Sequence, residues 1–95
     1  MTISDFILKN SIVRGNIPLF SKKNALELIK LCKIENKTIL GIDSFIVSPS
    51  AIQPVSEESI DFSYNKNSKS DYCNEAYEFI NSKSDGKYYY EVVFK

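Results

Sequence analysis

The sequence predicts an α+β domain in which a small three-stranded, mainly antiparallel sheet carries its helices on one face. Apolar residues recur at helical spacing over residues 22–35 and 71–82. Residues 38–47, 57–64 and 87–94 are instead rich in β-branched and aromatic residues or alternate polar with apolar ones. With one more short helix at the N-terminus, the order is ααββαβ. Such irregular interleaving is typical of the α+β class.

The composition is that of a single globular domain spanning residues 1–95. The chain of 95 residues is 43% hydrophobic and 25% charged, and a chain of this length buries roughly 60–70% of its unfolded surface. No apolar stretch approaches the ~18 residues that cross a bilayer. The first ten residues carry Asp5 beside a short apolar run, unlike a signal peptide. We therefore expect a cytoplasmic protein with no membrane partner.

Two helices are expected in the first part of the chain. Thr2 or Ser4 is suited to cap the first, whose apolar side continues into the dipeptide 12–13, and residues 14–20 are predicted to be a connection. Ser21 is suited to cap the second helix, over residues 22–35. Its apolar stripe consists of Ala25, Leu28, Ile29 and Cys32. The lysines on its other side are interpreted as a solvated surface rather than a phosphate site.

The segment 38–47 is predicted to be the central strand because it is apolar on both faces. Gly41 indicates a bulge or a close approach of another segment. Asp43 is the odd residue in the strand, and either a structural hydrogen-bonding role or a partner contact explains it. The next residues, 48–57, have the composition of a loop.

The next strand, 57–64, alternates regularly. Ile60, Phe62 and Tyr64 are expected to face the core while Asp61 faces outward. After a polar loop over 65–70, Ser70 is suited to cap the helix 71–82, whose predicted buried stripe is Cys73, Ala76, Tyr77 and Ile80.

The last strand is expected over residues 87–94, after an Asp-Gly turn signal. Tyr88, Tyr90, Val92 and Phe94 are predicted to share one of its faces. We expect it beside one member of an antiparallel pair formed by 38–47 and 57–64.

The charge is neutral overall but unevenly distributed. Residues 1–40 hold seven Lys/Arg and three Asp/Glu, and residues 41–95 hold five and nine. A nucleic-acid-binding protein normally has a basic stripe that neutralises phosphates, so direct nucleic-acid binding is not expected. The tyrosine run at 88–90 is explained more simply by core packing than by base stacking. A protein partner with a basic surface fits the acidic half better.

The sequence offers little for catalysis. It has no His, which removes the commonest general base and zinc ligand. Cys32 and Cys73 lie among apolar neighbours and are predicted to be buried free thiols rather than a disulfide or a metal site. Glu57 and Glu58 are adjacent, so at most one of them shares a strand face with Asp61. We expect no enzyme, no cofactor and no metal, with a small carboxylate-dependent hydrolase as an alternative.

Residues 41–64 contain four acidic residues and no Lys or Arg. Such a segment, with a loop between two strands, is a plausible binding surface. The predicted partner contacts are Asp43, Gln53, Glu57, Glu58, Asp61 and Tyr64.

Three fragments of this segment, GIDSF (41–45), IQP (52–54) and ESIDFS (58–63), carry a resemblance in their order and spacing. They resemble a family of small bacterial immunity proteins, which protect a cell against toxins delivered by its neighbours, including those of contact-dependent growth inhibition. The resemblance implies an inhibitor, monomeric when free, that forms a non-covalent complex with a cognate toxin domain. It implies that the toxin is a basic nuclease, of which many in these systems cut tRNA. A structural or regulatory subunit with a permanent partner is the alternative from another class.

Overall fold

The computed structural model describes residues 2–62 and 72–95 and confirms the α+β class. In these residues, α-helices, short and long strands and one 3-10 turn alternate along the chain. The elements are α1 (Ile3–Asn10), β1 (Ile12–Arg14), β2 (Ile17–Leu19), α2 (Lys22–Ile34), β3 (Ile39–Val47), β4 (Ile52–Pro54), η1 (Ser56–Glu58), β5 (Ile60–Asp61), α3 (Tyr72–Asn81) and β6 (Tyr89–Phe94). The predicted loop 65–70, the cap Ser70 and the predicted contact Tyr64 lie outside the described residues.

The first two helices begin where their capping residues predict. The Thr2 hydroxyl accepts a hydrogen bond from the Asp5 N–H at 3.1 Å, which satisfies one of the free donors of the first turn of α1. The Ser21 hydroxyl accepts from the Asn24 N–H at 3.4 Å at the start of α2. Asn36, with φ of 58°, takes the left-handed conformation just after α2 ends.

The prediction for residues 12–20 was wrong, because this segment forms a β-hairpin instead of a helix extension and a connection. β1 pairs antiparallel with β2, and Gly15 and Asn16 form the two-residue loop with φ of 55° and 69°. Two consecutive positive φ angles characterise the type I′ turn, which matches the twist of a hairpin. Phe20 then exchanges two backbone hydrogen bonds of 2.8 Å with Tyr90, which attaches the hairpin to β6.

The main sheet has four strands among the described residues, one more than predicted, and β3 is its centre. β6 runs antiparallel along one edge of β3, from Ile39 to Phe45. β4 and β5 pair antiparallel with the same central strand. β4 lies within the stretch 48–57 that was predicted to be a loop, and the predicted strand 57–64 is reduced to β5 in the described part of the chain.

The chain between β4 and β5, which both pair with the same edge of β3, contains an insertion. Pro54 is paired with Phe45 and Asp61 with Gly41, so seven steps (61 − 54) face four steps (45 − 41) of β3. The additional residues form η1. On β3 the register shifts between Ile39 and Gly41, and a Cβ on Gly41 would lie 2.8 Å from the Ile60 carbonyl oxygen. Both the bulge and the close approach predicted at Gly41 are therefore present.

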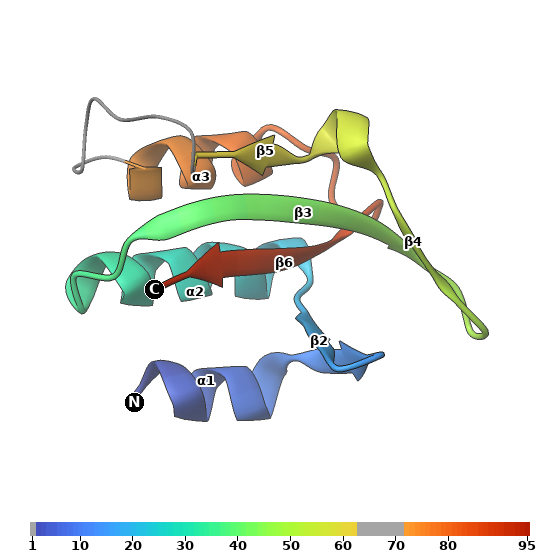
Figure 1. Cartoon of the computed structure of the whole chain (residues 1–95), viewed down its shortest axis with the longest axis horizontal. Coiled ribbons are helices and arrows are strands. Elements are labelled where there is room, and N and C mark those ends of the chain that lie inside the picture. Colours follow the sequence, from blue (N-terminus) through green and yellow to red (C-terminus); the bar gives the residue numbers. More distant parts are fainter. Residues whose placement is uncertain (1, 63–71) are drawn as a thin grey trace.

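The helices cover one face of this sheet. In Figure 1, α2 and α3 lie behind β6 and β5, and α1 packs against α2. The core between the layers combines the predicted stripe of α2 with one face of β3 and β6, and the rings of Phe6 and Phe20 join it with centroids 6.2 Å apart. On α3 the fully buried residues are Tyr72, Ala76 and Ile80, whereas Cys73 and Tyr77 are half-buried, a correction to the predicted stripe.

Candidate partner-binding site

Strand register gathers carboxyl groups on the sheet face opposite the helices. Ser44 and Tyr90 form a cross-strand pair and are both 0% exposed, with Tyr90 in the core. Successive residues of a strand point to opposite faces, so the neighbouring pair Asp43 and Glu91 points away from the helices. We call this side the acidic face. It comprises Gly41 and Asp43 on β3, Asp61 on β5, and Glu91 and Val93 on β6.

The acidic face contains a hollow with a volume of about 500 Å³. Two acids, Asp43 and Asp61, and two serines are among the residues that line it. The lining residues are Leu40, Gly41, Asp43, Ser56, Ser59, Ile60, Asp61 and Val93.

Asp43 and Glu91 face each other directly across β3 and β6, and both are half-buried. The pKa of Glu91 is raised above its ordinary value, first by burial and then by the charge of Asp43. Among the residues 2–62 and 72–95, no cation is paired with either carboxylate. Like charges directly opposite in a sheet are destabilising, so this pair costs the free chain some stability.

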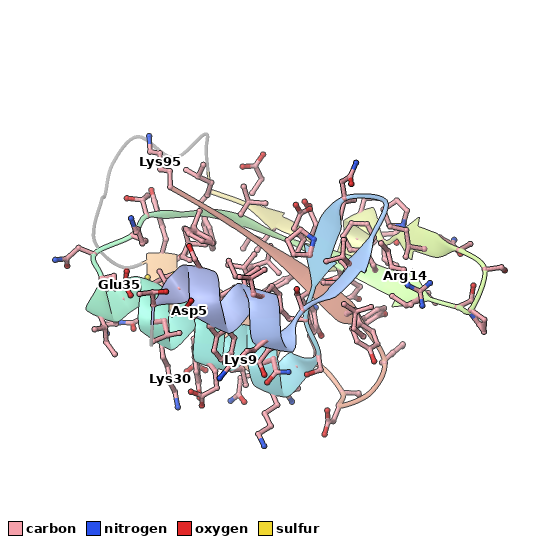
Figure 2. All side chains as sticks on the ribbon, turned by 90° about the horizontal axis from the view of Figure 1, so that it is seen from below. Asp5, Lys9, Arg14, Lys30, Glu35 and Lys95 are labelled. Atoms are coloured by element: carbon pink, nitrogen blue, oxygen red, sulfur yellow. The ribbon has the colours of Figure 1, made fainter. Side chains whose placement is uncertain are left out.

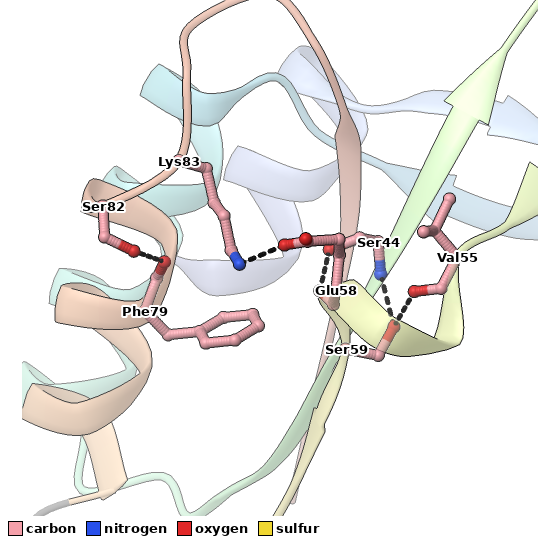
Figure 3. Close-up of polar contacts among 7 residues, drawn as sticks. All are labelled: Ser44, Val55, Glu58, Ser59, Phe79, Ser82 and Lys83. Atoms are coloured by element: carbon pink, nitrogen blue, oxygen red, sulfur yellow. Dashed lines mark hydrogen bonds and ion pairs between the residues drawn. The ribbon is translucent and has the colours of Figure 1, made fainter.

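The η1 insertion is held rigidly beside the acidic face by two serines (Figure 3). The Ser44 backbone accepts from the Val55 N–H at 2.9 Å and donates to the Ser59 hydroxyl at 3.0 Å. The Ser59 hydroxyl donates to the Val55 carbonyl at 2.9 Å, and the Ser44 hydroxyl donates to the Glu58 carbonyl. Every polar group of Ser44 on this side is therefore used to position η1.

The side chain of Glu58 is turned toward the protein. It forms an ion pair with Lys83 just beyond α3, and the side chains are 32% and 18% exposed. The Lys83 ammonium also lies 4.4 Å from the centre of the Phe79 ring. Figure 3 shows this pair joining η1 to the end of α3. The predicted contact Glu58 thus already has an intramolecular partner.

The other predicted contacts are distributed unequally. Asp43 and Asp61 meet at the hollow, and Glu57 is exposed on η1 next to the lining residue Ser56. Gln53 is exposed on β4 opposite Ile46, towards the end of the β3–β4 hairpin and outside the hollow. Glu91 was not among the predicted contacts. Alternation along 87–94 predicts that Glu91 and Tyr90 lie on opposite faces of the strand. Only the register of β6 against β3 places Glu91 opposite Asp43.

The opposite side of the molecule carries lysines. Lys30 points away from the sheet in Figure 2 and lies 3.5 Å from Glu27 and 5.8 Å from the centre of the Tyr77 ring. Lys33 donates to the Asn74 side chain at 2.9 Å, and Lys22 donates to the Lys83 carbonyl at 2.7 Å. These lysines are used at least partly to join α2 to α3. The lysines of α2 therefore lie on the helical side, which also carries the exposed acids Glu75 and Glu78 of α3.

Neither cysteine forms a disulfide. Cys32 is buried and Cys73 is half-buried, and both are free. Burial, with a smaller contribution from Cys73, raises the pKa of the Cys32 thiol to about 12. Among the described residues, no group of three or more His, Cys, Asp or Glu side chains is arranged to hold a metal ion. None of the helices described is long and apolar enough to span a bilayer.

Comparisons with protein-family models, with curated proteins and with solved structures found no match to this chain.

Proposed function

We propose that this chain is an immunity protein that binds a cognate nuclease toxin in the cytoplasm and neutralises it by a non-covalent complex. The resemblance of fragments 41–45, 52–54 and 58–63 supports the class of function. The acidic face supports the mechanism, and it is the observation on which the proposal depends. The protein acts by binding, without catalysis and without a cofactor.

The physical reason lies in what a nuclease needs. Lys and Arg side chains on the toxin hold the phosphates of its substrate, and carboxylates on an inhibitor compete for the same groups. Opposite charge on the two proteins also accelerates their association by about 10- to 1,000-fold at low salt. A fast association suits an inhibitor that must bind before the toxin acts.

The proposed contacts are the acids on and beside the acidic face. Asp43 and Asp61 line the hollow, and Glu57 extends the negative surface along η1. A typical interface buries roughly 1,600 Å² in total, so Gln53 on β4 lies within reach of a partner centred on the hollow. Glu58 contributes indirectly, since its ion pair with Lys83 holds η1 in place.

The test uses the toxin domain encoded beside this chain, with tRNA cleavage as the readout. We expect stoichiometric inhibition by the wild-type chain. The double variant Glu57→Lys/Asp61→Lys should bind the toxin at least tenfold more weakly at low salt, with a smaller difference at high salt. The matched control is Glu75→Lys/Glu78→Lys, which makes the same charge change at exposed positions of α3.

Failure of the wild-type chain to bind or inhibit the toxin would overturn the proposed function. If the two double variants weaken toxin binding equally, the effect comes from the net charge of the chain. That result would contradict the role of the acidic face. Size-exclusion chromatography of the purified chain distinguishes the proposed monomeric inhibitor from a subunit with a permanent partner.

A further inference from the structure

We infer that the Asp43–Glu91 pair, with the hollow beside it, receives an arginine side chain of the protein partner. This inference rests on the proposed function and specifies the chemistry of its recognition. It also adds Glu91 to the residues that determine specificity.

The two acidic residues are spaced so that one guanidinium can reach both. Residues directly opposite in an antiparallel pair have Cβ atoms about 4.5–5.5 Å apart, and Asp43 and Glu91 are such a pair on the acidic face. A guanidinium is planar and presents five N–H donors, so one group can donate to both carboxylates at this spacing. A lysine ammonium is a compact point charge without this fork of donors.

The surface next to the pair is hollowed. Asp43 and Val93 both line the hollow, and both lie on the acidic face, so an apolar side chain borders the hollow on the same face as the carboxyl group. The aliphatic part of an arginine side chain is favourably buried along such an apolar border while its charged end stays among polar groups. The volume of about 500 Å³ is ample for one side chain.

The negative charges of the pair are not compensated within the described residues. Neither carboxylate is paired with a cation in the parts of the chain that the structure describes, and the two groups face each other at partial burial. A cation that binds both removes their repulsion and gains two charge-assisted hydrogen bonds. The described residues do not supply a third ligand that would suit a metal ion. The complementary occupant is therefore a cationic side chain.

The site is tested by nuclear magnetic resonance titration of the chain with N-acetylarginine amide. N-acetyllysine amide is the matched probe, at the same ionic strength. We expect saturable shifts of the Gly41, Asp43 and Val93 amides with the arginine probe, and at least threefold weaker binding of the lysine probe. Asp43→Asn/Glu91→Gln should abolish the shifts, whereas Glu75→Gln/Glu78→Gln should leave them unchanged.

Equal binding of the two probes, shifts that persist in Asp43→Asn/Glu91→Gln, or no shift at these amides would each overturn the inference. Binding of the same variants to the toxin domain separates the two proposals. If the toxin binds Asp43→Asn/Glu91→Gln as tightly as the wild type, the arginine site is wrong while the immunity function stands. If the arginine probe binds the pair but no toxin associates with the chain, the function is wrong while the site stands.

Discussion

Two neighbouring pairs of residues on β3 and β6 serve opposite purposes. Ser44 and Tyr90 lie on the helical side and are fully buried, and the polar groups of Ser44 hold η1. Asp43 and Glu91, one residue away on each strand, lie on the acidic face without a cation among the described residues. The hydrogen bonds of Ser44 stabilise the fold, and the like charges of the second pair lower its stability.

The difference indicates where binding is to be expected on this sheet. The buried polar groups of Ser44 have satisfied hydrogen bonds, which helps to specify one structure, whereas the buried Tyr90 hydroxyl has no hydrogen-bond partner among the described residues. Two like charges that face each other without a cation in the free chain are instead typical of a surface that binds a partner. Such a surface lowers the stability of the free chain and serves its function. Four experiments test this contrast, from the largest expected effect to the smallest.

Ile42→Ala should give the largest loss of stability. Ile42 is 1% exposed, and it lies opposite Val92 on β6 and Ile60 on β5. Truncating such a side chain typically costs about 2–5 kcal/mol, because contacts are lost and a cavity remains. Urea unfolding measures the change. Ile46→Ala, on the same strand but at a position that is 44% exposed, is the control and should have a small effect.

Ser44→Ala should cost about 1–3 kcal/mol, because the Glu58 carbonyl loses its buried donor. Hydrogen exchange should show faster opening of the amides of η1 than of β6. Ser50→Ala, at an exposed position of the β3–β4 loop, is the matched control. Equal effects of the two variants would contradict the anchoring role of Ser44.

The Glu58–Lys83 ion pair should contribute about 0–1 kcal/mol, since both side chains remain partly exposed. A double-mutant cycle with Glu58→Gln and Lys83→Met isolates the coupling free energy. A coupling energy above about 2 kcal/mol would mean that the pair is a main determinant of the position of η1.

Glu91→Gln should raise stability by up to ~1 kcal/mol at neutral pH. The folded chain holds a proton on Glu91 more tightly than the unfolded chain, because burial and Asp43 raise the pKa above its ordinary value of 4.5. As pH rises from below 4.5 through the raised pKa, the wild type should therefore lose stability relative to the variant. Below that window the difference should disappear. Glu78→Gln, at an exposed position of α3, is the matched control for the loss of one negative charge.

Local signals predicted much of the fold. The cap Ser21 and the apolar spacing of α2 predicted that helix closely, and Gly41 indicated the bulge of β3. β4 was missed because Pro54 and the preceding serines have loop chemistry, although an edge strand tolerates a proline. The β1–β2 hairpin was missed because its strands are only three residues long and too short for a periodic pattern.

The candidate site was predictable only in part. The absence of Lys and Arg from 41–64 drew attention to Asp43 and Asp61, and both line the hollow. Glu58 could not be separated from its exposed neighbour Glu57, because the Lys83 pairing is a tertiary contact. Glu91 depends on a strand register between segments about 50 residues apart, which local patterns do not determine.

The most direct test of the account measures stability and affinity in one variant, Asp43→Asn/Glu91→Gln. The account predicts opposite changes, because the same repulsion that weakens the free chain is relieved by the partner. The urea midpoint should rise with an unchanged m-value, and the affinity for the toxin domain should fall at least tenfold, or ~1.4 kcal/mol. A variant that is less stable than the wild type and binds the toxin equally well would contradict it.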